Sequence, residues 1–130
     1  MFYNNFISLL LFLFNYILII TTYQPYKEET MVITENKVGD LLTLALEGRL
    51  DTTTAPSLQE ALIPSFDKAK DISLDFSGID YVSSAGLRVL LLGQKKALST
   101  GGKMSLKGVS EDVMEVLEMT GFDEMLTINS

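Results

Sequence analysis

The distribution of apolar and polar residues divides the chain into two parts. Residues 1–26 carry no Asp, Glu, Lys or Arg, and residues 6–20 read FISLLLFLFNYILII. This apolar run is shorter than the ~20 residues that a membrane-spanning helix needs. It also lacks the basic flank and the small-residue cleavage site of a signal peptide. Three interpretations of residues 1–30 remain open: a membrane anchor, a signal peptide, or translated sequence upstream of a native start at Met31.

Residues 31–130 have the pattern of a single globular domain, and short β-prone runs within them predict strands. Residues 32–37 and 41–46 flank a Val-Gly-Asp turn, which predicts a β-hairpin. Residues 71–76 alternate apolar and polar side chains with the period of a strand, and we expect a polar, glycine-containing turn after them. Two further strands are predicted at residues 103–107 and 125–128.

Helices are predicted between these strands by apolar residues spaced three and four apart. The clearest spans residues 84–99 and ends at the glycine pair that begins at Gly101. A second helix follows the potential caps of residues 51–54, with Pro56 in its first turn, where proline is tolerated. The third is predicted at residues 111–120, after a serine cap and before a glycine.

The predicted order of elements is β-β-α-β-α-β-α-β. Strands that alternate with helices form parallel sheets with right-handed crossovers, and the opening hairpin adds one antiparallel pair. The fold class is therefore α/β, with a mixed sheet packed against helices. We find no internal repeat in the sequence.

Composition narrows the possible functions. The net charge of −7 argues against nucleic-acid binding, which requires a basic surface. The chain contains no cysteine and no histidine. It therefore has no disulfides, no thiolate chemistry, no Ser-His-Asp triad and neither of the two residue types on which nearly all zinc sites depend. A binding function is favoured over catalysis, and no cofactor is expected.

Acidic residues and glycines in the predicted loops are candidate ligand sites. Asp51, Asp75 and Asp80 are predicted at strand ends or in the following loops, where α/β proteins often bind ligands. Their spacing matches no EF-hand or two-metal motif, so a metal site is not favoured. Gly78 and Gly86 belong to no phosphate-binding motif, and no lysine follows them to contact a phosphate.

Two adjacent serines, Ser83 and Ser84, stand where the 84–99 helix is predicted to begin. Either hydroxyl can cap the helix, a contribution of roughly 1 kcal/mol. The following Ala85 and Gly86 are small and leave a hydroxyl accessible. A phosphate there would add roughly −1.5 to −2 charge at the positive end of a helix, where it is tolerated. The residues alone leave open whether the serines serve as a cap or as a switch.

Residues 31–130 resemble the STAS domain of the small anti-sigma factor antagonists. The resemblance lies in a strand with an Asp that leads to a serine-containing turn and a Gly-Leu pair, with two flanking motifs. These residues are Leu74-Asp75-Phe76-Ser77-Gly78, Val82-Ser83-Ser84-Ala85-Gly86-Leu87, Glu47-Gly48-Arg49-Leu50-Asp51 and Met119-Thr120-Gly121-Phe122. Residues 1–30 have no counterpart in the usual stand-alone members, which favours a native start at Met31.

The resemblance implies a non-catalytic, cytoplasmic phosphoprotein that regulates transcription. In this family the serine two residues before Gly-Leu is phosphorylated, which corresponds to Ser84, with Ser83 as second choice. The kinase is also the anti-sigma factor, which the unmodified antagonist binds to release a sigma factor; a PP2C-type phosphatase reverses the modification. The surface expected to meet the partner consists of Asp51, Thr52, Asp75, Gly78, Asp80, Ser83, Ala85 and Gly86.

The sequence departs from the family at the two positions beside the acceptor. Many members have Asp before the phosphorylated serine and Ser or Thr after it, whereas this chain has Ser83 and Ala85. The alternative function is a STAS module of another assembly, either a stressosome-like scaffold or an accessory subunit of a lipid transporter. Membrane association is expected only if residues 1–30 are expressed.

Overall fold

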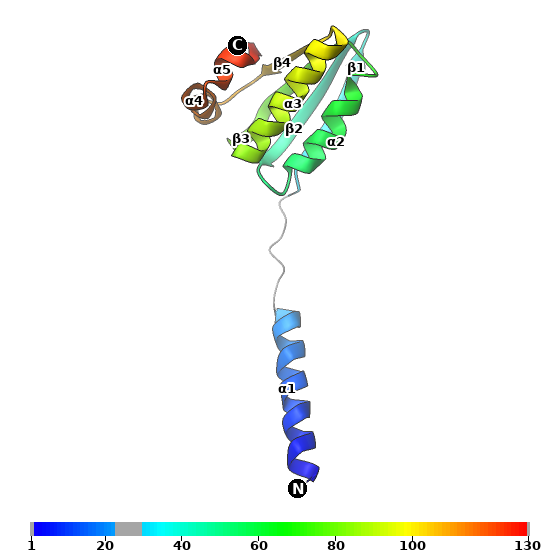
Figure 1. The fold of residues 1–130 in the computed structure, drawn as a ribbon, viewed down its shortest axis with the longest axis vertical. Coiled ribbons are helices and arrows are strands. Elements are labelled where there is room, and N and C mark those ends of the chain that lie inside the picture. Colours follow the sequence, from blue (N-terminus) through cyan, green and yellow to red (C-terminus); the bar gives the residue numbers. More distant parts are fainter. Residues whose placement is uncertain (1, 23–29, 130) are drawn as a thin grey trace.

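The computed structural model describes residues 2–22 and 30–129, and from residue 32 onward its elements follow the predicted order (Figure 1). The helices and strands are α1 (Phe2–Thr22), β1 (Val32–Val38), β2 (Leu41–Leu50), α2 (Ala55–Ser65), β3 (Asp71–Val82), α3 (Ser84–Thr100), β4 (Lys103–Lys107), α4 (Glu111–Thr120), α5 (Phe122–Met125) and β5 (Thr127–Asn129). The short helix α5 was not predicted. It takes up Met125, so the last strand begins two residues later than expected.

The five strands form one sheet in the order β1-β2-β3-β4-β5. The β1–β2 pair is antiparallel, with Gly39 of the hairpin turn at a φ of 61°. The β2–β3, β3–β4 and β4–β5 pairs are all parallel. The predicted mixed sheet, an antiparallel hairpin followed by parallel strands, is therefore confirmed.

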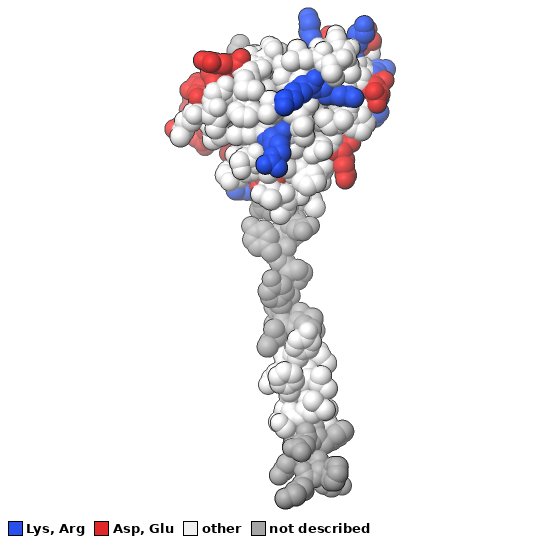
Figure 2. All heavy atoms as spheres, in the orientation of Figure 1, with Lys and Arg blue, Asp and Glu red and all other residues white. Residues whose placement is uncertain are grey.

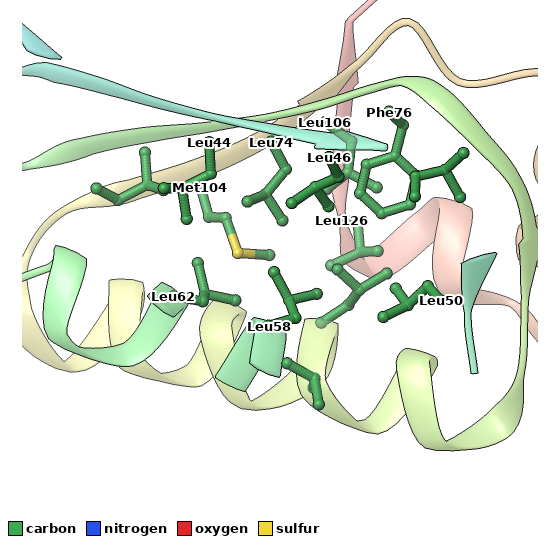
Figure 3. Packing of buried hydrophobic residues seen from close by; sticks show 14 of the residues in the cluster. Leu44, Leu46, Leu50, Leu58, Leu62, Leu74, Phe76, Met104, Leu106 and Leu126 are labelled. Atoms are coloured by element: carbon green, nitrogen blue, oxygen red, sulfur yellow. The ribbon is translucent and has the colours of Figure 1, made fainter. Parts of the chain in front are cut away.

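The hydrophobic core lies between the sheet and the helices. Leu58 and Leu62 of α2 face Leu44, Leu74 and Phe76 of the sheet (Figure 3), and all five side chains are at most 1% exposed. Burying a side chain of this size contributes about 1.5–3 kcal/mol. The two-residue alternation predicted for residues 71–76 therefore identified the buried side chains of this stretch, Ile72, Leu74 and Phe76, correctly.

Strand β3 is longer than predicted. We expected a turn after residue 76, but the strand continues to Val82 because β2 continues beside it to Leu50. Two irregularities in the β2–β3 pairing, at each of which β3 has one more residue than β2, shift the register along this half of the strand. The apolar positions of β3 there, Ile79 and Val82, are three residues apart and do not show the simple alternation of a regular strand.

Helix α1 precedes the sheet, and those of its side chains that the structure describes lie at residues 7–17. They are exposed, and most are large and apolar. They make no contribution to the buried core, whose first member is Met31. Of the residues described, none forms a helix with the length and hydropathy required to cross a membrane.

Candidate functional site

The ends of β2 and β3 bring the Asp51 turn next to the two serines. Leu50 pairs with Val82, and the Ser83 N–H donates a hydrogen bond to the Leu50 carbonyl oxygen at 2.8 Å. The turn that leads to α2 therefore lies beside the start of α3. This end of the sheet is the carboxyl end of two parallel strands, the usual location of functional sites in α/β folds.

Ser83 caps helix α3. Its backbone is extended (φ −93°, ψ 173°), and its Oγ accepts a hydrogen bond from the Gly86 N–H at 3.4 Å. Its carbonyl oxygen accepts the first hydrogen bond of the helix, from the Leu87 N–H at 3.0 Å. These are the features of an N-cap residue. Of the two serines, Ser83 therefore has the structural role.

Ser84 is the first residue of α3, and its side chain is exposed. The described part of the chain offers no hydrogen-bond partner to its hydroxyl. With the cap supplied by Ser83, the Ser84 oxygen is available to another protein at a position where helix N–H groups point outward. The geometry thus separates the two interpretations of the serine pair, a cap and an accessible hydroxyl, onto adjacent residues.

Gly86 lies beneath the surface and holds α3 close to β2. It is buried, and a Cβ at this position would lie 2.6 Å from Leu50 Cγ and 3.1 Å from the Leu50 carbonyl oxygen. No side chain fits in this space. Ala85, beside it, is half-buried. Of the two small residues that follow the serines, Ala85 is therefore partly exposed, and Gly86 allows α3 to pack closely against β2.

The Asp51 carboxylate organises the turn before α2. Its Oδ1 accepts hydrogen bonds from the Thr53 N–H at 2.9 Å, the Thr53 hydroxyl at 2.8 Å and the Thr54 N–H at 3.1 Å. These bonds, that of the Thr53 hydroxyl above all, hold the pKa of Asp51 below its ordinary value of 3.8, against the opposing effect of burial. Thr52 is exposed in the middle of the turn.

Thr54 completes the Asp51 turn in a way the sequence did not predict. Its hydroxyl donates a hydrogen bond to the Arg49 carbonyl oxygen at 2.6 Å and accepts one from the Asp51 N–H at 2.9 Å. It stands at the N-cap position of α2 but makes no side-chain cap bond. The run of threonines indicated a helix start, but not that one hydroxyl would connect β2 to the turn.

Asp75 lies far from the serines. It pairs with Ala45 and Lys107 in the middle of the sheet, seven residues before Val82, or roughly 23 Å along an extended strand. Its Oδ1 accepts hydrogen bonds from the Ser77 hydroxyl at 2.6 Å and the Ser77 N–H at 3.0 Å. These bonds, with a smaller effect of the Lys107 charge, lower the pKa of Asp75 against the opposing effect of burial.

Gly78 and Asp80 line an open hollow on the sheet, with a volume of about 950 Å³. Arg49 also lines it, and the Arg49 guanidinium lies 4.0 Å from the centre of the Tyr81 ring. This cation–π contact joins β2 to β3. The sequence could not indicate it, because the register of the irregular β2–β3 pair decides which side chains meet.

The predicted partner surface is thus distributed over three places. Asp51, Thr52, Ser83 and Ala85 gather around the start of α3 with Ser84; Gly78 and Asp80 belong to the hollow; Asp75 lies within the sheet. The prediction was wrong for Gly86, which is buried and lies beneath this surface. Among the described residues, no three acidic side chains come close enough together to hold a metal ion. The residues around Ser84 therefore offer another protein an accessible hydroxyl and a surface to bind.

Charge is unevenly distributed over the helices (Figure 2). Helix α3 carries Arg88, Lys95 and Lys96 and no acidic residue, and the Lys and Arg side chains gather over its outer face. Helices α4 and α5 carry only acidic charges, which lie at the other side of the same view. The start of α3 therefore adjoins a basic surface on a chain whose net charge is −7.

Comparison with known proteins identifies relatives of most of the region from β1 to β5. The family model described as "Mlab, STAS domain" matches residues 33–127. A Bordetella bronchiseptica protein named as an anti-sigma factor antagonist, BtrV, is 36% identical over 93 residues, which cover 71% of this chain and 80% of that protein.

Solved structures share the fold. A Thermotoga maritima protein named as an anti-sigma factor antagonist matches with a TM-score of 0.70 and 24% identity, over 75% of this chain and 86% of the other. The phosphorylated form of the Bacillus cell fate determinant SpoIIAA matches with a TM-score of 0.59 and 16% identity, over 76% of this chain and 92% of the other.

Proposed function

This chain belongs to the STAS domain family, and from that membership we propose that it is an anti-sigma factor antagonist. Unmodified, it binds an anti-sigma factor and so releases a sigma factor for transcription. Phosphorylation of Ser84 abolishes that binding. The domain that does this consists of residues 31–130, and it acts in the cytoplasm, where transcription takes place.

The observation that carries the proposal is the division of roles between the two serines. Ser83 accepts the capping hydrogen bond from Gly86, so α3 does not depend on the Ser84 hydroxyl. Ser84 is exposed at the first position of the helix. A residue that is modified and restored repeatedly must be accessible, and its modification must leave the fold intact. Ser84 meets both requirements, whereas modification of Ser83 would remove a cap.

In this proposal the protein is a substrate and the partner supplies the catalysis. The Ser84 Oγ attacks the γ-phosphorus of ATP held by the kinase; the Oγ–P bond forms, the bond to ADP breaks, and the hydroxyl proton passes to a base of the kinase. The chain has no histidine or cysteine that would serve catalysis of its own. A phosphatase of the PP2C type hydrolyses the phosphoserine and restores the hydroxyl.

The phosphate would act on the complex through charge. It adds about −1.5 to −2 charge at the start of α3, a charge that the helix N-terminus tolerates in the free protein. In an interface the same charge must lose its water and meet a surface shaped for a neutral hydroxyl. The fold therefore survives phosphorylation while the complex does not.

Phosphorylation mapping tests the proposed acceptor. The full chain, Ser84→Ala and Ser83→Ala are each incubated with ATP-Mg and a purified anti-sigma factor kinase from the same organism, and the peptide of residues 82–88 is analysed by mass spectrometry. We expect one phosphate on the wild type and on Ser83→Ala, and none on Ser84→Ala. Labelling of Ser84→Ala at the wild-type level would show that the assignment is wrong.

The second candidate function is a STAS module that binds its partner constitutively, as a stressosome-like scaffold or as a subunit of a lipid transporter. The exposed apolar side chains of residues 7–17 favour it, because they suit an assembly at a membrane. Ser83 and Ala85, which replace the usual neighbours of the acceptor, also favour it. Affinity purification that recovers a transporter ATPase and no kinase would support this candidate over the first.

A further inference from the structure

Arg88 lies one helical turn after Ser84 on the same face of α3. Both side chains are exposed. Residues four apart on a helix have Cβ atoms about 5–6 Å from each other. Side chains on a helix also tilt toward its N-terminus, so the side chain of Arg88 leans toward Ser84.

Arg88 is not engaged by other groups. Within the part of the chain that the structure describes, its guanidinium makes neither an ion pair nor a hydrogen bond. Helix α3 contains no Asp or Glu that could compete for it. An anion placed on Ser84 would be the first acidic group of the helix and would lie within reach of an unpaired cation.

We propose that a phosphate on Ser84 is bound by the Arg88 guanidinium of the same helix. The inference rests on the proposed phosphorylation of Ser84. The guanidinium donates parallel N–H hydrogen bonds in the geometry that phosphate oxygens accept. The order also matches the favourable arrangement on helices, with the acid four residues N-terminal to the base. Arg88 therefore recognises the modification from within the protein.

The pair changes the surface that a partner would meet. Before modification α3 presents three positive charges, those of Arg88, Lys95 and Lys96. A phosphate of −1.5 to −2 charge reduces their sum to about +1 to +1.5. It also occupies Arg88, the cation of α3 nearest to Ser84 along the helix. Phosphorylation thus adds a negative charge and also engages the guanidinium that a partner would otherwise contact.

Lys95 provides a matched control, because it lies on the same helix but too far away. Eleven residues separate it from Ser84, a rise of roughly 16 Å along the helix axis. Its neutralisation changes the net charge of α3 by the same amount as neutralisation of Arg88. A difference between the two variants therefore reports on the local pair and not on the overall charge.

The test uses the full chain with phosphoserine incorporated at position 84 during translation, and no kinase. Thermal unfolding is measured with and without the phosphate in wild type, Arg88→Gln, Arg88→Lys and Lys95→Gln. We expect phosphorylation to raise the unfolding midpoint by about 2–4 °C in wild type and Lys95→Gln. The rise should fall to half or less in Arg88→Gln and be intermediate in Arg88→Lys. An equal rise in wild type and Arg88→Gln would overturn the proposal.

NMR at pH 7.5 follows the Nε–H resonance of Arg88 directly. This resonance would stay unchanged if Arg88 only supported the fold and did not bind the phosphate. It should shift and exchange more slowly with water when Ser84 carries the phosphate. A resonance that is the same in both forms would also overturn the proposal. Because no kinase is used, this result does not depend on whether a kinase modifies Ser84 in the cell, and failed kinase labelling would leave the pair intact.

Discussion

Ser83 and Ser84 are adjacent and chemically identical, yet the start of α3 gives them different tasks. The extended backbone of Ser83 turns its Oγ back toward the helix, where the Gly86 N–H is located. Ser84 already belongs to the helix, and its side chain faces outward. The sequence predicted that a serine would cap this helix, but the choice between the two depends on the residue at which the helix begins.

Removal of each hydroxyl should therefore affect stability differently. Ser83→Ala loses a cap, and we expect the free energy of unfolding to fall by about 0.5–2 kcal/mol. Ser84→Ala loses an exposed hydroxyl, and we expect a change within roughly 0.5 kcal/mol. Urea unfolding followed by circular dichroism measures both. Equal losses in the two variants would contradict the assigned roles.

Gly86 should be intolerant of a side chain. Gly86→Ala introduces a Cβ 2.6 Å from Leu50 Cγ and 3.1 Å from the Leu50 carbonyl oxygen, and overpacking of this kind costs typically about 1–3 kcal/mol. Two of the three close atoms belong to the Leu50 side chain, so the same substitution should cost less in a Leu50→Ala background. Urea unfolding of the four proteins gives the coupling energy. A cost that is unchanged by Leu50→Ala would place the clash in the backbone.

At the scale of elements, the sequence predicted the bounds of those helices and strands that local signals define. It did not predict the length of the strand that depends on pairing with a distant strand. The bounds of β4 and α4 follow from their neighbours in sequence, and α4 begins after the Ser110 cap as expected, with a 3.2 Å hydrogen bond from the Val113 N–H. The length of β3 is decided by its irregular pairing with β2. That one error placed Asp75 at the end of the strand and Asp80 in a loop after it, near the serines, whereas both lie within β3.

The Asp51 turn should make stability depend on pH. The folded state lowers the pKa of Asp51 below 3.8, so the ionised carboxylate stabilises the fold. This contribution is fully present above the unfolded pKa and is lost as the pH falls through the folded pKa. Because Asp51 is largely open to solvent, we expect a modest effect.

Urea unfolding between pH 6 and pH 2.5 measures this dependence, with Asp51→Asn as the comparison. Wild type should lose stability below about pH 4, and part of this loss should disappear in Asp51→Asn. Asp67→Asn is a suitable control because Asp67 is exposed beyond the end of α2. Identical pH profiles of wild type and Asp51→Asn would mean that the turn does not hold the carboxylate in its ionised form.

At the scale of the whole molecule, the described core is supplied from Met31 onward. The described side chains of α1 are exposed, and those of the core run from Met31 to Leu126. We therefore expect a chain of residues 31–130 to unfold at the same urea concentration as the full chain. A chain of residues 34–130, which lacks Met31 and half-buried Ile33, should be less stable. A lower midpoint for residues 31–130 would show that the N-terminal segment contributes to the domain.

The charge distribution and the position of Ser84 both lead us to expect that a phosphate on Ser84 would weaken a complex formed at the start of α3. The start of α3 joins the accessible hydroxyl to the basic surface of Arg88, Lys95 and Lys96. A phosphate there alters the local charge more than it alters the fold. The family could be predicted from the motif residues, while the assignment of the cap to Ser83 and of the exposed hydroxyl to Ser84, and the exposure of Arg88 one turn away, required the three-dimensional structure.

The most direct measurement is the affinity of the full chain for the anti-sigma factor proposed as its partner, with and without phosphoserine at position 84. Isothermal titration calorimetry at fixed salt compares the two forms, with Ser84→Ala as an unmodifiable control. We predict that the phosphate weakens binding by about 30-fold or more, a loss of at least about 2 kcal/mol, and that Ser84→Ala binds nearly as well as the unmodified chain. Equal affinity of the phosphorylated and unmodified forms would contradict the account.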